Sequence, residues 1–461
     1  MQKHFAGALT AIDIKQHISH HFQLAAGITE LSIHFTYSPG HVDGDVNMLT
    51  LTVLDANGFR GAGHRHAPDI NGRATHHVDI GVASATPGYI PGPLPAGEWT
   101  VFIDTHSILP DAPVTYTIDI TADNAGASCC LPEIAPKPIA SVRQGRGWFR
   151  GDLHAHTLHS DATWDAAALA AFMRSRGMDF ATLSDHNTVS GLREWDALTS
   201  VDFLTIGAIE MTTFYGHCLA WGTREWVNWQ TSPGRREMAD IAEEVTARGV
   251  LFAIAHPTAV GDPICTGCNW IYPDMQPGSA RIVEVWNSYW TSDSNNDDAV
   301  KLWYTWLNQG YRMVATAGTD AHGAWIEPAE FAFNTVYADG LNEAAILQAI
   351  RLGHLFISAG PSLELTGQGA TGMTAMMGDL LPGDVAQVHV QWDHCNGDER
   401  LNVIADGREL FSIDGAGVKG SYAWTLNARE ARWCNVELRD RHNHIRALTN
   451  PIFMHQGDAI A

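Results

Sequence analysis

The stretch Gly151-Asp-Leu-His-Ala-His-Thr-Leu-His-Ser-Asp161 follows a strand-like segment, 147–153, and it decides how the rest of the chain is interpreted. Side chains two positions apart point to the same face of an extended chain, so His154 and His156 can present their imidazoles to one cation. Asp161 can join them from the following loop. In a chain with 24 histidines a lone His-x-His pair carries little weight, so the prediction depends on what recurs further along.

Short apolar runs, most of them bordered by His, Asp or Glu, alternate with helix-like stretches through the middle of the chain. The runs and their polar residues are 178–183 with Asp185 and His186, 201–209 with Glu210, 218–221 preceded by His217, 249–255 with His256, 281–285 containing Glu284, and 313–317 with Asp320 and His322. The helix-like stretches are 165–176, 234–248, 296–309 and 342–351. This alternation predicts a parallel βα barrel, whose strands all end on the face where barrel enzymes keep their chemistry. Any single polar residue could instead be a helix N-cap or a satisfied buried group, but the whole set is expected to converge.

The ordered series resembles the PHP (polymerase and histidinol phosphatase) family of metal-dependent hydrolases. Its motifs are His154-x-His-Thr-x-x-Ser-Asp, Asp185-His-Asn, Glu210, His256-Pro and Gly318-Thr-Asp-Ala-His. The resemblance covers roughly residues 147–361 and implies an α/β fold, a distorted (β/α)7 barrel. Local segments such as Glu210-Met-Thr-Thr and Ser358-Ala-Gly-Pro look most like the carbaryl-hydrolase (CehA/McbA) branch of that family.

The resemblance implies three groups of metal ligands. The first group is His154, His156, Glu210 and Asp320; the second is Glu210 as a bridge with His217 and His256; the third is Asp161, His186 and His322. Asp161 departs from the all-histidine form of the third position. Imidazoles and carboxylates without a thiolate favour an open catalytic site, and they suit zinc, manganese or iron. Two or three divalent ions are therefore expected.

The expected chemistry is hydrolysis by a metal-bridging hydroxide. Two divalent ions about 3.5–4 Å apart lower the pKa of a bridging water and polarise the oxygen of the bond being broken. Glu210 is the bridging carboxylate. Asp185 could orient an imidazole, and Glu284 has no metal assigned to it, so both are candidates for proton transfer. A structural carboxylate that hydrogen-bonds barrel loops is an equal alternative for Glu284.

The residues around the metals bear on which bond is cut. Phosphoester hydrolysis usually needs Arg or Lys beside the metals, and basic residues are sparse at the strand ends. The nearest by sequence are Arg193, Arg235 and Lys301. The segment after His256 is instead rich in aromatic residues, which predicts an apolar or aromatic organic substrate. The candidate substrate contacts are Trp270, Tyr272, Trp286 and Asn287, with Tyr289 and Trp290 beside them.

Hydrolysis of an ester, amide or carbamate of a small organic molecule is therefore the favoured function. The first alternative is a phosphoesterase that acts on a small phosphomonoester or phosphodiester. The second alternative is a catalytically silent metal-binding scaffold. A degenerate site should have lost ligands, however, and here the series from His154 to His322 is complete.

Length and patterning predict three domains, because 461 residues exceed what one core normally supports. Residues 1–140 carry short alternating runs broken by Gly, Pro and Asn, which predicts an antiparallel β-sandwich. The Pro-rich segment 131–140 predicts an extended linker into the barrel, which is expected to span 141–362. Residues 363–461 are expected to form a second β-rich region that packs on the barrel or completes it.

Histidines and cysteines outside the series could form a further metal site or a disulfide. The N-terminal histidines are His17, His20, His21, His64, His66, His76 and His77. Because they lack interleaved carboxylates at strand ends, we expect surface or turn positions for them. Cys265-x-x-Cys268 is expected in a loop near the active-site mouth, with its redox state open. Cys129 and Cys130 are adjacent and the total of seven cysteines is odd, which argues against a complete disulfide framework.

The formal net charge of −23, from 51 acidic and 28 basic residues, disfavours a nucleic-acid partner because phosphate backbones would be repelled. The sequence has no run typical of a signal peptide or a membrane span, so a cytoplasmic enzyme with a small-molecule substrate is expected. The sequence leaves the oligomeric state open.

Overall fold

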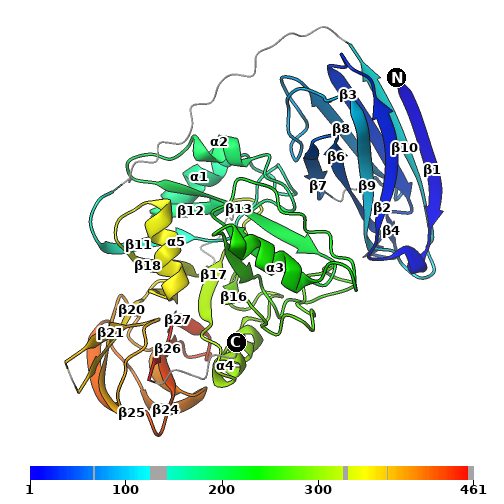
Figure 1. Ribbon diagram of the computed structural model, residues 1–461. Coiled ribbons are helices and arrows are strands. Elements are labelled where there is room, and N and C mark those ends of the chain that lie inside the picture. Colours follow the sequence, from blue (N-terminus) through cyan, green and yellow to red (C-terminus); the bar gives the residue numbers. More distant parts are fainter. Residues whose placement is uncertain (66–67, 125–142, 325–330, 371, 455–461) are drawn as a thin grey trace.

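The computed structural model describes residues 1–65, 68–124, 143–324, 331–370 and 372–454. Figure 1 shows three parts in chain order: blue N-terminal sheets, a middle part from cyan to yellow that carries the helices, and orange to red C-terminal strands. The predicted linker at 131–140 lies outside the described residues, and so do Cys129, Cys130 and His66.

The N-terminal part contains two four-stranded antiparallel sheets, in the orders β1-β10-β3-β8 and β2-β9-β6-β7, and a two-stranded sheet, β4-β5. Its elements are β1 (Gln2–Leu9), η1 (Ala11–Asp13), β2 (His17–Leu24), β3 (Glu30–Ser38), β4 (His41–Val42), β5 (Asp45–Val46), β6 (Met48–Asp55), β7 (Gly58–Gly63), β8 (Ala74–Gly81), β9 (Gly97–Ser107) and β10 (Val114–Asp123). Alternate residues of β3, such as Ile33 and Phe35, are buried and share one apolar core with Leu51 and Val53 of β6. The alternation places one face of each four-stranded sheet in that core, which confirms the predicted antiparallel β-sandwich.

The middle part is built on a mixed sheet in the order β17-β16-β15-β14-β13-β12-β11-β18-β19. Its strands are β11 (Gly147–Asp152), β12 (Phe180–Leu183), β13 (Leu204–Thr213), β14 (Gly216–Trp221), β15 (Leu251–Ile254), β16 (Ile282–Asn287), β17 (Val314–Gly318), β18 (Phe333–Ala338) and β19 (Leu355–Ser358). The pairs β11–β12, β12–β13, β15–β16 and β16–β17 are parallel. The pattern of strands alternating with helices therefore predicted most of this sheet.

The expectation of an all-parallel barrel is wrong at β18, which runs antiparallel to β11 and β19, and at β14, which runs antiparallel to both β13 and β15. Parallel neighbours need a crossover of a dozen or more residues, whereas only Phe214 and Tyr215 connect β13 to β14. The hairpin places the start of β14 beside the end of β13, with His217 opposite Thr212. His217 therefore reaches the same edge as the strand ends although it follows the beginning of its own strand.

The predicted helices are present as α1 (Ala166–Ser175), α3 (Met238–Ala247), α4 (Asn296–Asn308) and α5 (Glu343–Leu352), and a short helix, α2 (Leu192–Asp196), was not expected. Asp165 caps α1 by accepting a hydrogen bond from the Ala168 amide, and Asn342 caps α5 in the same way. The buried faces of these helices cover the mixed sheet with side chains such as Leu169 and Ile346.

The C-terminal part contains a second antiparallel sheet, β21-β20-β22-β25, and strands that extend the middle sheet in the order β19-β27-β26-β23-β24. Its strands are β20 (Ser362–Gly369), β21 (Thr374–Met376), β22 (Val385–Asp393), β23 (Arg400–Ala405), β24 (Arg408–Ile413), β25 (Gly420–Asn427), β26 (Trp433–Arg439), β27 (Ile445–Thr449) and β28 (Ile452–Phe453). The predicted β-rich region is therefore joined to the middle part by main-chain hydrogen bonds between β19 and β27. The exact domain boundaries stay predictions.

Two further features bear on the predictions. Cys265 and Cys268 form a disulfide, while Cys218, Cys395 and Cys434 are free and buried among the described residues. Within the described ranges, no helix is both long enough and apolar enough to cross a membrane.

Candidate metal centre

The predicted ligands meet at one edge of the mixed sheet. They lie after β11 (His154 and His156), in the loop before α1 (Asp161), after β12 (His186), within β13 (Glu210), near the start of β14 (His217), after β15 (His256) and after β17 (Asp320 and His322). The backbone of His256 and Asp320 has positive φ angles of 25° and 52°. Non-glycine residues in such conformations cost about 1–3 kcal/mol each and concentrate at functional sites. The strained backbone at His256 and Asp320 therefore orients these two side chains.

Glu210 is the centre of the group. Its Oε2 lies 3.2 Å from His154 Nε2, 3.4 Å from His156 Nε2 and 2.8 Å from His186 Nδ1. Its Oε1 lies 3.1 Å from His217 Nδ1 and 3.2 Å from His256 Nε2. The two carboxylate oxygens thus face two different sets of imidazoles, as a bridging carboxylate would.

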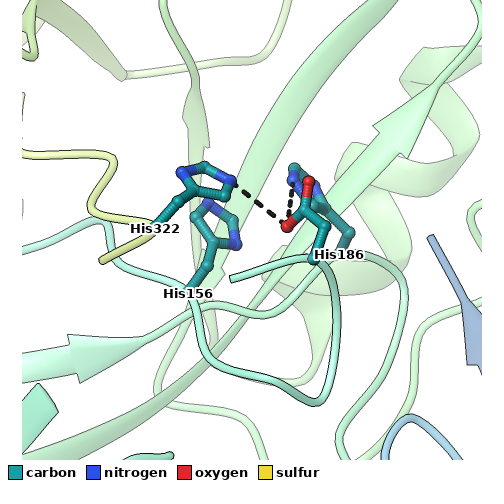
Figure 2. A group of neighbouring side chains, drawn as sticks. His156, His186 and His322 are labelled. Carbon is teal, nitrogen blue, oxygen red and sulfur yellow. Dashed lines mark ion pairs between the residues drawn. The ribbon is translucent and has the colours of Figure 1, made fainter. Parts of the chain in front are cut away.

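Asp320 and Asp161 each lie between two imidazoles of the cluster. Asp320 Oδ1 lies 2.9 Å from His156 Nε2 and 3.5 Å from His154 Nε2. Asp161 Oδ1 lies 3.2 Å from His322 Nε2 and 3.6 Å from His186 Nε2, the two ion pairs drawn as dashed lines in Figure 2. Three groups have ligand atoms close enough to hold an ion: His156, Asp161, His186 and His322; His154, His156 and Asp320; and His154, Glu210 and His256.

The grouping differs from the predicted one. His154 is grouped with Glu210 and His256, and Glu210 is not in the group of His154, His156 and Asp320. His156 belongs to the Asp161 group as well as to the Asp320 group, because its ring lies 4.2 Å from the ring of His186 and 4.3 Å from that of His322 between centroids. His217 is in none of the three groups of described residues but contacts Glu210 directly. The positions expected to be separate therefore share ligands.

Buried polar atoms without a hydrogen-bond partner concentrate in this cluster. They are His154 Nε2, His156 Nδ1 and Nε2, Asp161 Oδ1, Glu210 Oε2, His217 Nε2 and Asp320 Oδ1. Several lie within ion-pair distance of each other but in geometries that make no hydrogen bond, which indicates that they face common points. Each unsatisfied buried group costs about 1–3 kcal/mol, or more when it is charged. Imidazole nitrogens and carboxylate oxygens are the ligands of zinc, manganese and iron, so the residues present fit divalent metal ions.

The carboxylates and imidazoles of the cluster shift each other's pKa values. Burial opposes ionisation of Glu210, yet His154 and His186 hold the pKa of this carboxyl well below its usual value. The same imidazoles and His322 lower the pKa values of Asp161 and Asp320 against the effect of burial. Burial, reinforced by His186 and His322, lowers the pKa of His156 to about 4. At neutral pH the carboxylates are therefore ionised and His156 is uncharged. The carboxylates in turn raise the pKa values of His154, His186, His256 and His322 against the effect of burial, so a metal ion bound by these imidazoles would displace their protons.

Glu284 makes the imidazole contact that was expected of Asp185. His154 Nδ1 lies 3.1 Å from Glu284 Oε1, and the His256 amide donates to Glu284 Oε2 at 3.0 Å. Asp185 instead accepts hydrogen bonds from the amide and hydroxyl of Thr157 and from the hydroxyl of Ser160. Asp185 thus fixes the loop before Asp161, and its predicted contact with an imidazole is not among these bonds.

The predicted aromatic mouth is wrong for Trp270 and Tyr272. Both are buried in the core of the middle part, where Trp270 Nε1 donates to the Met275 carbonyl at 2.7 Å and the Tyr272 hydroxyl lies 2.6 Å from Thr213 Oγ1. An apolar core gains more from burying these rings than from leaving them at a polar metal centre.

The other predicted substrate contacts divide between two places. Trp286, with Tyr289 and Trp290, lines a separate cavity of about 390 Å³. Asn287 stays beside the metal centre, because its amide group donates to Glu284 Oε2 at 3.0 Å and to Asp320 Oδ2 at 3.3 Å. Of the four predicted contacts, Asn287 is thus the one placed against the cluster.

Basic side chains do not pair with the carboxylates of the cluster in the described part of the chain. The ion pairs of Asp161, Glu210 and Asp320 are all with histidines. Lys301 lies on α4 and pairs with Asp298, and Arg193 lies on α2. Among these ion pairs, no Lys or Arg side chain contacts a carboxylate of the cluster, as the sequence predicted.

Two residues of the N-terminal part approach the centre. The His64 ring lies 4.3 Å from the His186 ring between centroids, so the prediction of a surface or turn position for His64 is wrong. Arg65 donates to backbone carbonyls in the loop that carries Asp161. His21 and His77 are exposed as expected. The contact could not be predicted because it joins two distant stretches of sequence, and the only local signal is the pair of histidines beside Arg65.

No protein-family model and no curated protein matches the chain. Among solved structures, it is similar to a two-domain protein from Bacteroides vulgatus described as containing a predicted PHP-like metal-dependent phosphoesterase, with 14% identity, a TM-score of 0.38 and coverage of 71% of this chain and 99% of that one. It is also similar to an amidohydrolase from Chromobacterium violaceum (14% identity, TM-score 0.27, 38% and 87% covered). A protein from Bifidobacterium adolescentis described as a metal-dependent phosphoesterase is similar at 15% identity, with a TM-score of 0.29 and 43% and 94% covered. The likeness is distant, so the assignment of ligands rests on the geometry of the site.

Proposed function

We propose that this protein is a metal-dependent hydrolase of the PHP kind. The observation that carries the proposal is the set of buried imidazole and carboxylate atoms without hydrogen-bond partners around Glu210. A protein that gained nothing from this cluster would be more stable with apolar side chains in its place. The completeness of the set argues against a silent scaffold.

The ligands are proposed as three neighbouring positions. Glu210 Oε2 with His154, His156 and Asp320 would hold the first ion, Glu210 Oε1 with His217 and His256 the second, and Asp161 with His156, His186 and His322 the third. Divalent ions bound there supply an activated water and a polarised substrate oxygen.

The surrounding residues orient the ligands. Glu284 accepts a hydrogen bond from His154 Nδ1, which leaves His154 Nε2 directed at Glu210 and free to bind a metal. Asn287 fixes both Glu284 and Asp320. The amide of Thr319 and its hydroxyl donate to Asp152, which holds the turn before Asp320. We assign Glu284 and Asn287 as positioning residues.

The fold is proposed to be a distorted (β/α)7 barrel. The support is main-chain pairing between the segments that follow β11 and β17: Ala155 bridges Ala321, the His156 amide donates to the Ala321 carbonyl at 3.0 Å, and the Asp320 amide donates to the His154 carbonyl at 2.8 Å. Such pairing brings the ligands that follow these two strands into one site.

The proposed bond is an ester, amide or carbamate, as in the carbaryl-hydrolase branch that the sequence resembles. The support is that the carboxylates of the site pair with histidines and with no Lys or Arg of the described residues. Hydrolysis of a phosphoester is helped by Lys or Arg side chains that stabilise the charged phosphoryl oxygens, whereas hydrolysis of a carbonyl compound needs only a polarised carbonyl oxygen.

A panel of aryl carboxylate esters, aryl carbamates and the matching aryl phosphates tests this proposal on protein reconstituted with zinc or manganese. We expect a higher kcat/KM for the carboxylates and carbamates, because transition-state interactions determine this ratio. A clear preference for phosphomonoesters would contradict the proposed bond and favour the phosphoesterase alternative. No turnover of any member by protein with full metal content would contradict the hydrolase itself.

A further inference from the structure

The N-terminal sandwich reaches the metal centre through His64 and Arg65, which directly follow β7. The His64 ring lies against His186, and His64 Nδ1 is buried without a hydrogen-bond partner. Arg65 lies next to it in sequence and points to the loop after β11. The two neighbours thus contact two separate ligand-bearing loops of the middle part.

The contacts of Arg65 bracket Asp161. Its Nη2 donates to the Leu158 carbonyl at 3.0 Å and to the Ala162 carbonyl at 3.3 Å, and its Nε donates to the Ser160 carbonyl at 3.0 Å. A planar guanidinium presents its donors in a fixed fork, so three carbonyls bound to it are held in one arrangement. Because the partners are carbonyl oxygens, the role of Arg65 is to fix geometry.

Asp161 needs such support more than most ligands do. His154, His186, Glu210, His256 and Asp320 lie within strands or within two or three residues of a strand end, whereas Asp161 lies well past the end of β11, in the loop before α1. Asp185 holds this loop from the side of the middle part through Thr157 and Ser160. Arg65 holds it from the side of the sandwich, through carbonyls on both sides of Asp161 in the sequence.

A close backbone contact locks the sandwich to the same loops. Thr188 Oγ1 donates to the Gly88 carbonyl at 2.7 Å, and the Gly88 amide donates to Ser190 Oγ at 3.1 Å. A Cβ on Gly88 would lie 2.5 Å from the Ala62 carbonyl oxygen and 3.0 Å from that of His159. Only glycine fits there at its φ of +100°. The sandwich thus contacts the middle part at His159, in the loop after β11, and at Thr188 and Ser190, in the loop of His186.

We propose that the third metal position is built across the boundary between the sandwich and the middle part, with Arg65 and His64 as its positioning residues. This inference rests on the proposed function, because it concerns one of the proposed metal positions. The sandwich is then part of the active site. Without Arg65, the Asp161 loop keeps its hydrogen bonds to Asp185 but loses its anchor on the sandwich, while the contacts of the ligands around Glu210 are unchanged.

The test compares Arg65→Met with the wild type. Methionine keeps much of the apolar stem and removes every donor. Arg73→Met is the matched control, since Arg73 is an exposed arginine of the same sandwich with the same charge. Each protein is dialysed against a series of buffered Zn²⁺ concentrations, and its bound metal is measured by mass spectrometry. Urea unfolding of each metal-free protein checks folding.

We expect Arg65→Met to bind one equivalent about 10- to 100-fold more weakly, as is typical for lost support of a ligand, with the other equivalents unchanged. Arg73→Met should match the wild type. Arg65→Lys keeps the charge but cannot span three carbonyls, so it should fall between the two. If Arg65→Met loses its cooperative unfolding transition, Arg65→Lys carries the test alone, and wild-type affinity in that variant overturns the inference.

The outcomes separate this inference from the proposed function. A wild-type protein that binds three equivalents and an Arg65→Met variant that binds them with the same affinity would overturn the inference alone. Equal weakening of all equivalents would also overturn it, because Arg65 would then support the whole cluster. A wild-type protein that binds no metal would overturn the proposed function, and the inference with it.

Discussion

His106 of β9 lies at the buried seam between the sandwich and the middle part, and its replacement should change how stability depends on pH. The ring is fully buried against Phe214 and Trp229, and its Nε2 lies 3.0 Å from Thr50 Oγ1. Burial, reinforced by nearby His17 and His217, lowers the pKa of His106 to about 3. In the unfolded chain the pKa of histidine is about 6.5, so below that pH the unfolded chain takes up a proton that the folded protein does not.

The sign and size of the effect follow from these two values. Above pH 6.5 the ring is neutral in both states and its contribution to folding is complete. As the pH falls from 6.5 towards 3, the free energy of unfolding decreases by about 1.4 kcal/mol per unit, which gives about 2 kcal/mol at pH 5. His106→Gln keeps a polar group near Thr50 and removes the titration.

Urea unfolding of the metal-free wild type and His106→Gln between pH 5 and pH 8 measures this difference. The other histidines titrate in both proteins and largely cancel. We expect the gap in unfolding free energy to shift by about 2 kcal/mol in favour of the variant between pH 8 and pH 5. A gap that stays constant over this range would refute the reasoning, because His106 would then titrate alike in both states.

Three further substitutions test the division of the site and the role of the aromatic segment. His154→Ala should weaken binding at the positions around Glu210, because His154 contacts both Glu210 and Asp320, whereas His322→Ala should affect the Asp161 position alone. Metal content after dialysis measures both, and equal losses in the two variants would show a single cooperative cluster. Trp270→Ala should lower the free energy of unfolding by about 3–5 kcal/mol, because the ring is buried and its indole N–H is hydrogen-bonded. A stable Trp270→Ala variant whose KM rises for bulky aryl substrates would instead restore the predicted aromatic mouth.

The sequence could place the candidate ligands together because each lies next to a recognisable element. Apolar runs indicate strands, and parallel strands bring their ends together, so the sequence alone places His186, His256 and Asp320 at one edge. His154 and His156 were predicted for a similar reason, since residues two apart share a face of an extended chain.

The features that the sequence did not predict depend on contacts without a local pattern. The direction of β14 is set by a two-residue connection, and the apolar run of β14 has the same appearance in either direction. Trp270 and Tyr272 could not be distinguished from substrate contacts, because aromatic residues at the ends of elements occur in both roles. Arg65 belongs to the N-terminal part and contacts the Asp161 loop of the middle part. A local sequence pattern carries no information about a contact between two distant parts of the chain.

The most direct test of the central claim is anomalous diffraction, at the absorption edge of the bound metal, from crystals of protein purified without chelators. The account predicts peaks on both sides of the Glu210 carboxylate, one among His154, His156 and Asp320 and one beside His217 and His256, each about 2.0–2.2 Å from its ligand atoms. Electron density with the side chains in place and no peak beside either Glu210 oxygen would contradict the account.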